Sequence, residues 1–257
     1  METLDSISFL KIDGEDLSLK QVLGYLQLSG NLQPFLQEVA SQHVIYTEIQ
    51  SREDLEISVA EFEQAAIDFR MERNLTSSEL FQQWLANNGI DYTAFKSRVA
   101  FALKVQKLKS RTAEADLETY FQERRRSLDR VDISCAFVAT RQEAEELLSR
   151  ITASGSNIEQ FAQGDKEGEN SNVEIIRGPT FRRNLPADLN DKVDSVPIGE
   201  LLGPLEINGR WCLFQVERIL PAALEGQVKR ELENELFKRW LIDKAKQLDI
   251  KLSVSAS

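Results

Sequence analysis

The residues that could do covalent chemistry are few in this sequence. It contains one histidine, His43, and two cysteines, Cys135 and Cys212. One histidine cannot supply the usual zinc ligand sets, and a Ser-His-Asp triad would depend on His43 alone. His43 falls on the apolar face of a predicted helix, and Cys135 has no histidine base nearby in the sequence, so we interpret both as structural. No phosphate-binding glycine loop is present. We therefore expect no metal and no cofactor.

The clearest local signal is in residues 198–219, which read IGELLGPLEINGRWCLFQVERI. Asn-Gly at 208–209 favours a type I′ hairpin turn between two strands. Strand alternation places Trp211 and Leu213 on one side and Cys212 and Phe214 on the other. Trp211 is either ordinary core or the floor of a binding cleft, and the sequence leaves both open. If Trp211 is at a cleft, we expect Cys135 to share its side, which argues against a Cys135–Cys212 disulfide.

The composition indicates the class of protein and disfavours some kinds of partner. The 257 residues are 42% hydrophobic and 28% charged, as in a globular chain, with a net charge of −11. This charge disfavours nucleic acid and anionic membranes, and the basic run 124–126 sits among acids. The first residues, METLDSISFLKIDGEDLS, lack the basic and apolar regions of a signal peptide. We therefore expect a cytoplasmic protein; an extracytoplasmic location would require that a signal was removed.

The segments on either side of the middle of the chain have helical patterns. After a short strand at 7–12, capping-box spacings begin helices at Ser18, Ser58 and Thr76, while Asn31 and Asp91 begin two more. The apolar residues follow a 3–4 spacing in each of them. Beyond Pro221, an apolar stripe from 224 to 248 predicts one long helix, and residues 250–254 could form a terminal strand.

The middle of the chain alternates strands and helices. Residues 131–138 (VDISCAFV) read as a strand, Thr140 caps a helix that ends at Gly155, and a short helix covers 157–163. A polar loop at 164–172 precedes a strand at 173–176, a helical face at 185–196 and the hairpin. The predicted order is β-α-α-β-α-β-β.

This order resembles the parvulin (rotamase) domain, a peptidyl-prolyl isomerase. The resemblance is carried by ISCAFVATRQEAEEL, FRRNLPADLNDKV and VPIGELLGPLEINGRWCLFQVERI. The flanking helices resemble those of SurA- and PrsA-type chaperones. The resemblance implies an α+β fold: a helical module from 1–127, an inserted parvulin-like domain at 128–221, and a helix and strand at 222–257 that complete the helical module.

The resemblance also implies a substrate-binding site. Active parvulins usually carry two histidines, and Cys135 and Trp211 stand at those positions here. Arg177 falls near a glycine-rich family segment, and Leu185 and Leu189 correspond to the apolar proline pocket. No catalytic residue is assigned, and Arg182 and Arg183 are expected in solvent or gripping a substrate. The implied binding residues are Cys135, Phe137, Arg177, Phe181, Leu185, Leu189, Trp211 and Leu213.

Three functions remain open at this stage. The chain could be a weakly active prolyl isomerase or chaperone that binds extended apolar or proline-containing segments. Alternatively, it could be an inactive escort in the maturation or export of a precursor peptide, or a plain interaction scaffold. The implied partners are unfolded or precursor polypeptides, with no nucleic acid and no membrane insertion, and a homodimer could form through the helical module.

Overall fold

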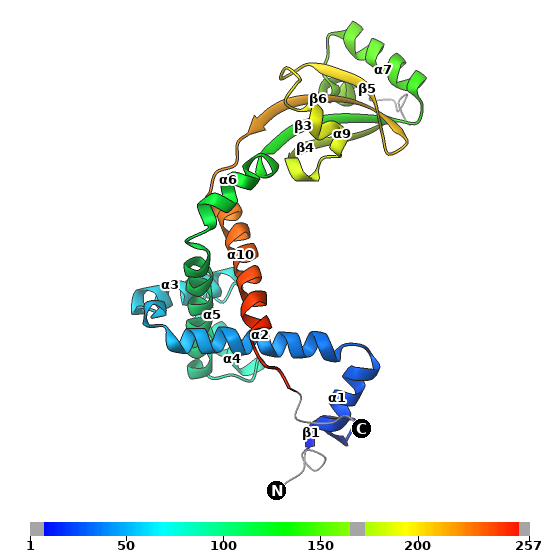
Figure 1. The fold of residues 1–257 in the computed structure, drawn as a ribbon. Coiled ribbons are helices and arrows are strands. Elements are labelled where there is room, and N and C mark those ends of the chain that lie inside the picture. The colour runs from blue at the N-terminus through cyan, green and yellow to red at the C-terminus, as the bar shows by residue number, and fades with distance from the viewer. Residues whose placement is uncertain (1–7, 165–172, 252–257) are drawn as a thin grey trace. The chain divides into compact units, whose positions relative to one another are not determined.

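The computed structural model describes residues 8–164 and 173–251, and it divides into two compact units (Figure 1). The first unit consists of Met1–Leu117 with Glu233–Ser257, and the second of Glu118–Leu232. The mixture of helices and strands confirms the predicted α+β class. The second unit extends further at both ends than the segment 128–221 that the sequence predicted.

The first unit is built on helices. A β1–β2 hairpin turns at Asp13-Gly14, where both residues have positive φ, and leads into the helices. The elements are β1 (Ser8–Ile12), β2 (Glu15–Ser18), α1 (Leu19–Leu28), α2 (Leu32–Ser51), η1 (Glu53–Leu55), α3 (Val59–Glu72), α4 (Ser78–Asn87), α5 (Tyr92–Ala113) and most of α10 (Gly226–Lys246).

Two apolar clusters hold this unit together. In one, Ile45 and Ile49 of α2 pack with Leu55 of η1, Leu108 of α5 and Phe237 of α10. In the other, edge-to-face aromatic contacts join α3, α4 and α5 around Phe95. Offset and edge-on ring pairs of this kind add to the energy of simple burial.

The sequence located the helices of this unit well but not every detail. Capping boxes form at Ser18 and Ser58 as predicted. The cap of α4, however, is Ser77 rather than Thr76, because the Ser77 hydroxyl accepts the Leu80 N–H. His43 was expected on the packed face of α2, but it is exposed, since Val44 and Ile45 are the buried residues there. Of the expected terminal strand, residues 250–251 are not in a strand, and 252–254 lie outside the described residues.

The second unit is a four-stranded antiparallel sheet with helices on both faces. Its strand order is β4-β3-β6-β5, so β3 and β6 are central and β4 and β5 are edges. The elements are α6 (Leu117–Leu128, whose first residue belongs to the other unit), β3 (Arg130–Val138), α7 (Arg141–Ser154), α8 (Ile158–Gly164), β4 (Glu174–Phe181), η2 (Arg182–Asn184), α9 (Ala187–Lys192), β5 (Leu201–Ile207) and β6 (Arg210–Leu220).

The element order in this unit follows the prediction, with two differences of length. β4 continues to Phe181, well beyond the predicted end at 176, and α9 covers only part of the predicted 185–196. The predicted polar loop lies largely in 165–172, outside the described residues. The turn at Asn208-Gly209 has positive φ at both residues, as a type I′ hairpin requires.

Candidate functional site

The two central strands divide the second unit into two apolar faces. Residues directly opposite each other in an antiparallel pair project to the same side of the sheet. Cys135 lies opposite Phe214, and Phe137 lies opposite Cys212. Between these pairs, Ala136 lies opposite Leu213, on the other side. We call these sides the α9 face and the α7 face, after the helices that cover them (Figure 1).

Four of the predicted site residues come together on the α9 face. Cys135 and Leu189 are buried, and Phe137 and Leu185 are half-buried against the same cluster. Leu189 reaches this face from α9, and Leu185 from the segment just before it. The face therefore offers an apolar surface whose outer parts remain partly accessible.

Trp211 and Leu213 lie on the other side of the sheet. Trp211 is opposite Val138, and both pack with α7 residues such as Leu147. The Arg141 guanidinium stands 5.6 Å from the Trp211 ring centroid, a cation–π contact. The expectation that Cys135 and Trp211 share a side is therefore wrong. Trp211 lies opposite Val138, and Val138 projects from β3 to the side opposite Cys135.

The two predicted residues of β4 also lie apart from the α9 cluster. Arg177 is exposed opposite Ser134 and forms a 3.6 Å ion pair with Glu159 of α8. Phe181 lies opposite Arg130, and the Arg183 guanidinium is 4.6 Å from its ring centroid. The structure thus brings together Cys135, Phe137, Leu185 and Leu189, and separates them from the remaining predicted set.

Cys212 and Phe214 belong to the α9 face, although neither was among the predicted site residues. Cys212 is fully buried, and Phe214 is 2% exposed. The Cys212 thiol donates to the backbone carbonyl of Leu213 at 3.3 Å. The neighbouring Cys212 side chain lowers the pKa of Cys135. The neighbouring Cys135 side chain, together with burial, raises the pKa of Cys212. Alternation along β6 placed Cys212 and Phe214 on a common side, but the cross-strand register to β3 was needed to show which side.

Arg182 holds α9 in place and is not solvated, contrary to expectation. Its side chain is only 3% exposed. Its Nε donates to Asn190 Oδ1 at 2.9 Å, and its Nη1 lies 2.7 Å from Asp194 Oδ1. The Arg182 guanidinium, helped by Arg126, lowers the pKa of Asp194. A planar guanidinium that binds several acceptors fixes geometry well, so Arg182 positions the helix that carries Leu189.

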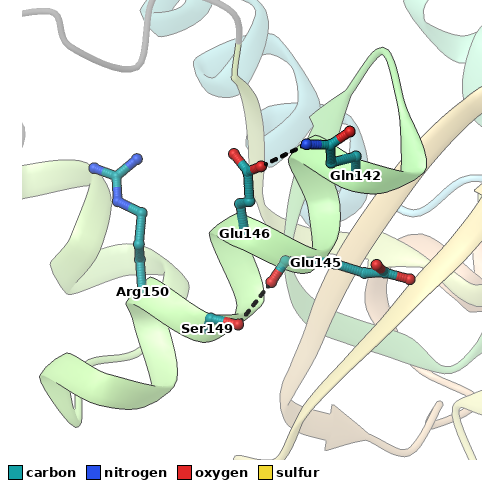
Figure 2. Close-up of a pocket in the computed structure, with 5 residues that line it drawn as sticks. All are labelled: Gln142, Glu145, Glu146, Ser149 and Arg150. Carbon is teal, nitrogen blue, oxygen red and sulfur yellow. Dashed lines mark hydrogen bonds between the residues drawn. The ribbon is translucent and has the colours of Figure 1, made fainter.

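A surface hollow of about 450 Å³ lies elsewhere, along the outer side of α7. Figure 2 shows that the five residues that line it are polar or charged and all come from this helix. Gln142 donates to Glu146 at 3.0 Å, and the Ser149 hydroxyl donates to the Glu145 carbonyl at 2.9 Å. Sites for apolar ligands are mainly apolar with a few polar groups, so this hollow does not fit a proline ring.

One family model matches the middle of the chain. Residues 112–226 match the family described as the PPIC-type PPIase domain. No curated protein sequence matches the chain. This family match covers the sheet, both of its faces and the helices around them.

Solved structures that resemble the chain over most of its length are foldases and chaperones. A peptidyl-prolyl isomerase PrsA from Bacillus cereus is 12% identical, with 98% of this chain and 96% of that chain covered and a TM-score of 0.43. Foldase PrsA from Streptococcus pneumoniae is 14% identical, with 97% and 96% covered and a TM-score of 0.38. A SurA-like chaperone from Campylobacter jejuni is 14% identical, with 95% and 98% covered and a TM-score of 0.27.

Proposed function

We propose that the chain binds extended apolar or proline-containing polypeptide segments and catalyses X–Pro isomerisation weakly. The premise is that residues 112–226 match the PPIC-type peptidyl-prolyl isomerase domains, the parvulins. The observation that carries the proposal is this family match, joined to the partly accessible apolar α9 face. The inactive escort that the sequence left as an alternative is not favoured by the match.

The reaction places modest demands on a protein. Rotation about the X–Pro bond crosses a barrier of about 20 kcal/mol and takes tens of seconds or more without help. No covalent bond is made or broken, so the protein needs only to hold the proline ring and favour the twisted amide over the planar one. Apolar side chains around a ring supply the first requirement. The second usually needs polar groups. The buried cluster of the α9 face is built from aliphatic and aromatic side chains and the two thiols, which is why we propose weak catalysis.

We propose that the binding residues are those gathered on the α9 face. Cys135 and Leu189 form its buried floor, and Phe137 and Leu185 are accessible enough to touch a ligand. Cys212 joins the floor beside Cys135. Trp211 and Leu213 are left out because they pack against α7 on the opposite side of the sheet.

The partners follow from the same proposal. The ligand is an unfolded or precursor polypeptide rather than nucleic acid, in keeping with the net charge of −11. No helix within residues 8–164 or 173–251 is long and apolar enough to cross a membrane. The cytoplasmic location and a homodimer through the helical module stay predictions, to be tested by cell fractionation and by sedimentation.

The proposal is tested by measuring peptide binding and isomerisation together. We expect the full chain to bind fluorescently labelled X–Pro peptides by anisotropy and to accelerate their isomerisation slightly in a protease-coupled assay. Leu185→Ala should weaken peptide binding several-fold. Leu148→Ala is the matched control, because Leu148 is also half-buried but packs on the α7 face. Equal effects of the two variants would place the site elsewhere, and no binding of any peptide would overturn the proposal.

A further inference from the structure

The two cysteines of the chain lie on the same face of the same sheet. Both are free thiols, Cys135 is 4% exposed, and Cys212 is fully buried. They belong to one apolar cluster, among side chains that include Leu189 and Val193. The sequence argued against a disulfide between them because the two side chains were expected on opposite sides of the sheet. The structure places them on the same side.

The register makes the two thiols diagonal neighbours on adjacent strands. Cys135 of β3 is opposite Phe214, and Cys212 of β6 is two residues before Phe214, on the same side. The same diagonal relation joins Phe137 and Arg210, whose guanidinium reaches to 5.1 Å from the ring centroid. This direction across the strand pair therefore brings side chains toward one another, and the two thiols lie in one buried cluster.

We propose that Cys135 and Cys212 form a cross-strand dithiol that a small peroxide oxidises to an intramolecular disulfide, and that this oxidation weakens peptide binding at the α9 face. The binding part of the proposal rests on the proposed function. The disulfide part rests only on the register, the burial and the cluster of the two thiols.

The oxidation balances without any group beyond the peroxide. The Cys135 thiolate attacks one peroxide oxygen, the O–O bond breaks, and the sulfur becomes a sulfenic acid as water is released. The Cys212 sulfur then attacks the Cys135 sulfur, the S–S bond forms, and the hydroxyl leaves as a second water molecule. Two thiols and one peroxide thus give one disulfide and two water molecules. Cys135 is the first nucleophile because it is 4% exposed whereas Cys212 is fully buried, and because the neighbouring Cys212 lowers the pKa of Cys135.

Burial selects which oxidants can act. A bulky disulfide reagent cannot reach thiols this deeply buried, whereas hydrogen peroxide is close to water in size. A disulfide between diagonal positions also draws the two strands together, and strained disulfides are the readily reduced kind. The dithiol is therefore suited to reversible oxidation rather than to permanent crosslinking.

Oxidation should affect peptide binding because the proposed binding residues pack against the two sulfur atoms. Phe137, Leu185 and Leu189 pack on the cluster that contains both thiols. Joining the sulfurs shortens their separation to about 2.05 Å. The side chains above them must then repack, and interiors this dense do not absorb such a change without loss of fit.

The first measurement is the mass of the intact, folded chain after treatment with hydrogen peroxide. We expect a loss of two hydrogen atoms, a peptide linking Cys135 to Cys212 in a non-reducing digest, and full reversal by dithiothreitol. Separate sulfinic acids on the two cysteines, or no oxidation until the protein unfolds, would overturn the dithiol.

Two variants control this measurement. Cys212→Ser should abolish the loss of two hydrogen atoms. The double variant Cys135→Ala/Ala136→Cys keeps two thiols but moves one to the α7 face, because Ala136 lies on that side. It should not form the link, and circular dichroism would show that it is folded. A link formed equally well by this double variant would contradict the geometry.

The second measurement compares peptide affinity of the reduced and oxidised chain. We expect the oxidised form to bind a labelled X–Pro peptide several-fold more weakly and to recover on reduction. A disulfide that forms without any change in affinity would overturn the regulatory part. If neither form binds peptide, the proposed function fails, while the mass measurement still decides whether the dithiol exists.

Discussion

The Arg182 guanidinium lies 2.7 Å from the Asp194 carboxylate, with the arginine almost fully buried and the aspartate half exposed. This pair joins the end of β4 to the segment that follows α9. The arginine also donates to the Asn190 carbonyl at 3.3 Å, near the end of that helix. The position of the most buried residue of α9, Leu189, therefore depends on a polar anchor rather than on apolar packing alone.

Replacing Arg182 should destabilise the second unit. Arg182→Met leaves two acceptors of Asn190 without their donor, and an unsatisfied buried polar group costs about 1–3 kcal/mol. We expect a fall of about 2–3 kcal/mol in the free energy of unfolding, measured by urea denaturation. Arg183→Ala is the matched control, because Arg183 is exposed and its ion pair with Glu231 should contribute less than about 1 kcal/mol. Equal losses would contradict the anchor.

The Asp194 pair predicts a dependence of stability on pH. Arg182 lowers the pKa of Asp194 from its ordinary value of 3.8 in the folded chain. A carboxyl whose pKa is lowered by folding stabilises the folded state above its unfolded pKa and loses that contribution as pH falls through the folded pKa. The wild type should therefore exceed Asp194→Asn in urea midpoint at pH 7, and the difference should shrink below pH 4 or so. A difference that grows on acidification would contradict this assignment.

Trp211 should matter for stability but not for peptide binding. Trp211→Phe removes part of the packing on the α7 face and the contact with Arg141, at a cost of about 1 kcal/mol. Thermal unfolding would measure that cost. Peptide anisotropy should give an unchanged dissociation constant, since the α9 face lies on the other side of the sheet. A marked loss of peptide affinity in this variant would contradict the prediction and indicate that Trp211 contacts the peptide.

Gly203 should not tolerate a side chain. It has a φ of +125°, and a Cβ there would stand 2.6 Å from the Cys212 carbonyl oxygen. Gly203→Ala combines backbone strain with this clash, so we expect a loss of at least about 3 kcal/mol in urea denaturation. Gly178→Ala is the control, because its φ is +110° but its Cβ would meet nothing within 4 Å. It should lose only the strain, about 1–2 kcal/mol, and a larger loss than at Gly203 would refute the steric argument.

Local signals in the sequence predicted the elements well. The capping boxes at Ser18, Ser58 and Thr140 form, and helix α7 ends at Gly155 in the left-handed conformation. The Asn208-Gly209 turn joins the two strands that it was expected to join. Each of these depends on residues within a few positions of one another, which is the range over which sequence patterns carry information.

The site depended on relations that no local pattern contains. The sequence correctly predicted which residues of β6 share a side. The register of β6 against β3, however, decides whether Cys135 shares a side with Trp211 or with Cys212. A shift of one residue exchanges the two faces completely. Arg182 was expected in solvent or gripping a substrate. Its burial follows from acceptors on Asn190 and Asp194 that only the fold brings to it.

Both edge strands of the sheet carry a proline, Pro179 in β4 and Pro204 in β5. Proline has no N–H, so it interrupts the row of donors that an edge offers to another strand. Under the proposed function the chain meets many polypeptide segments able to add to a sheet, and uncontrolled addition leads to aggregation. The two prolines therefore work against capture of the ligand backbone at either edge. Binding of polypeptides then depends on contacts with side chains, which are reversible, rather than on backbone pairing at the sheet edges.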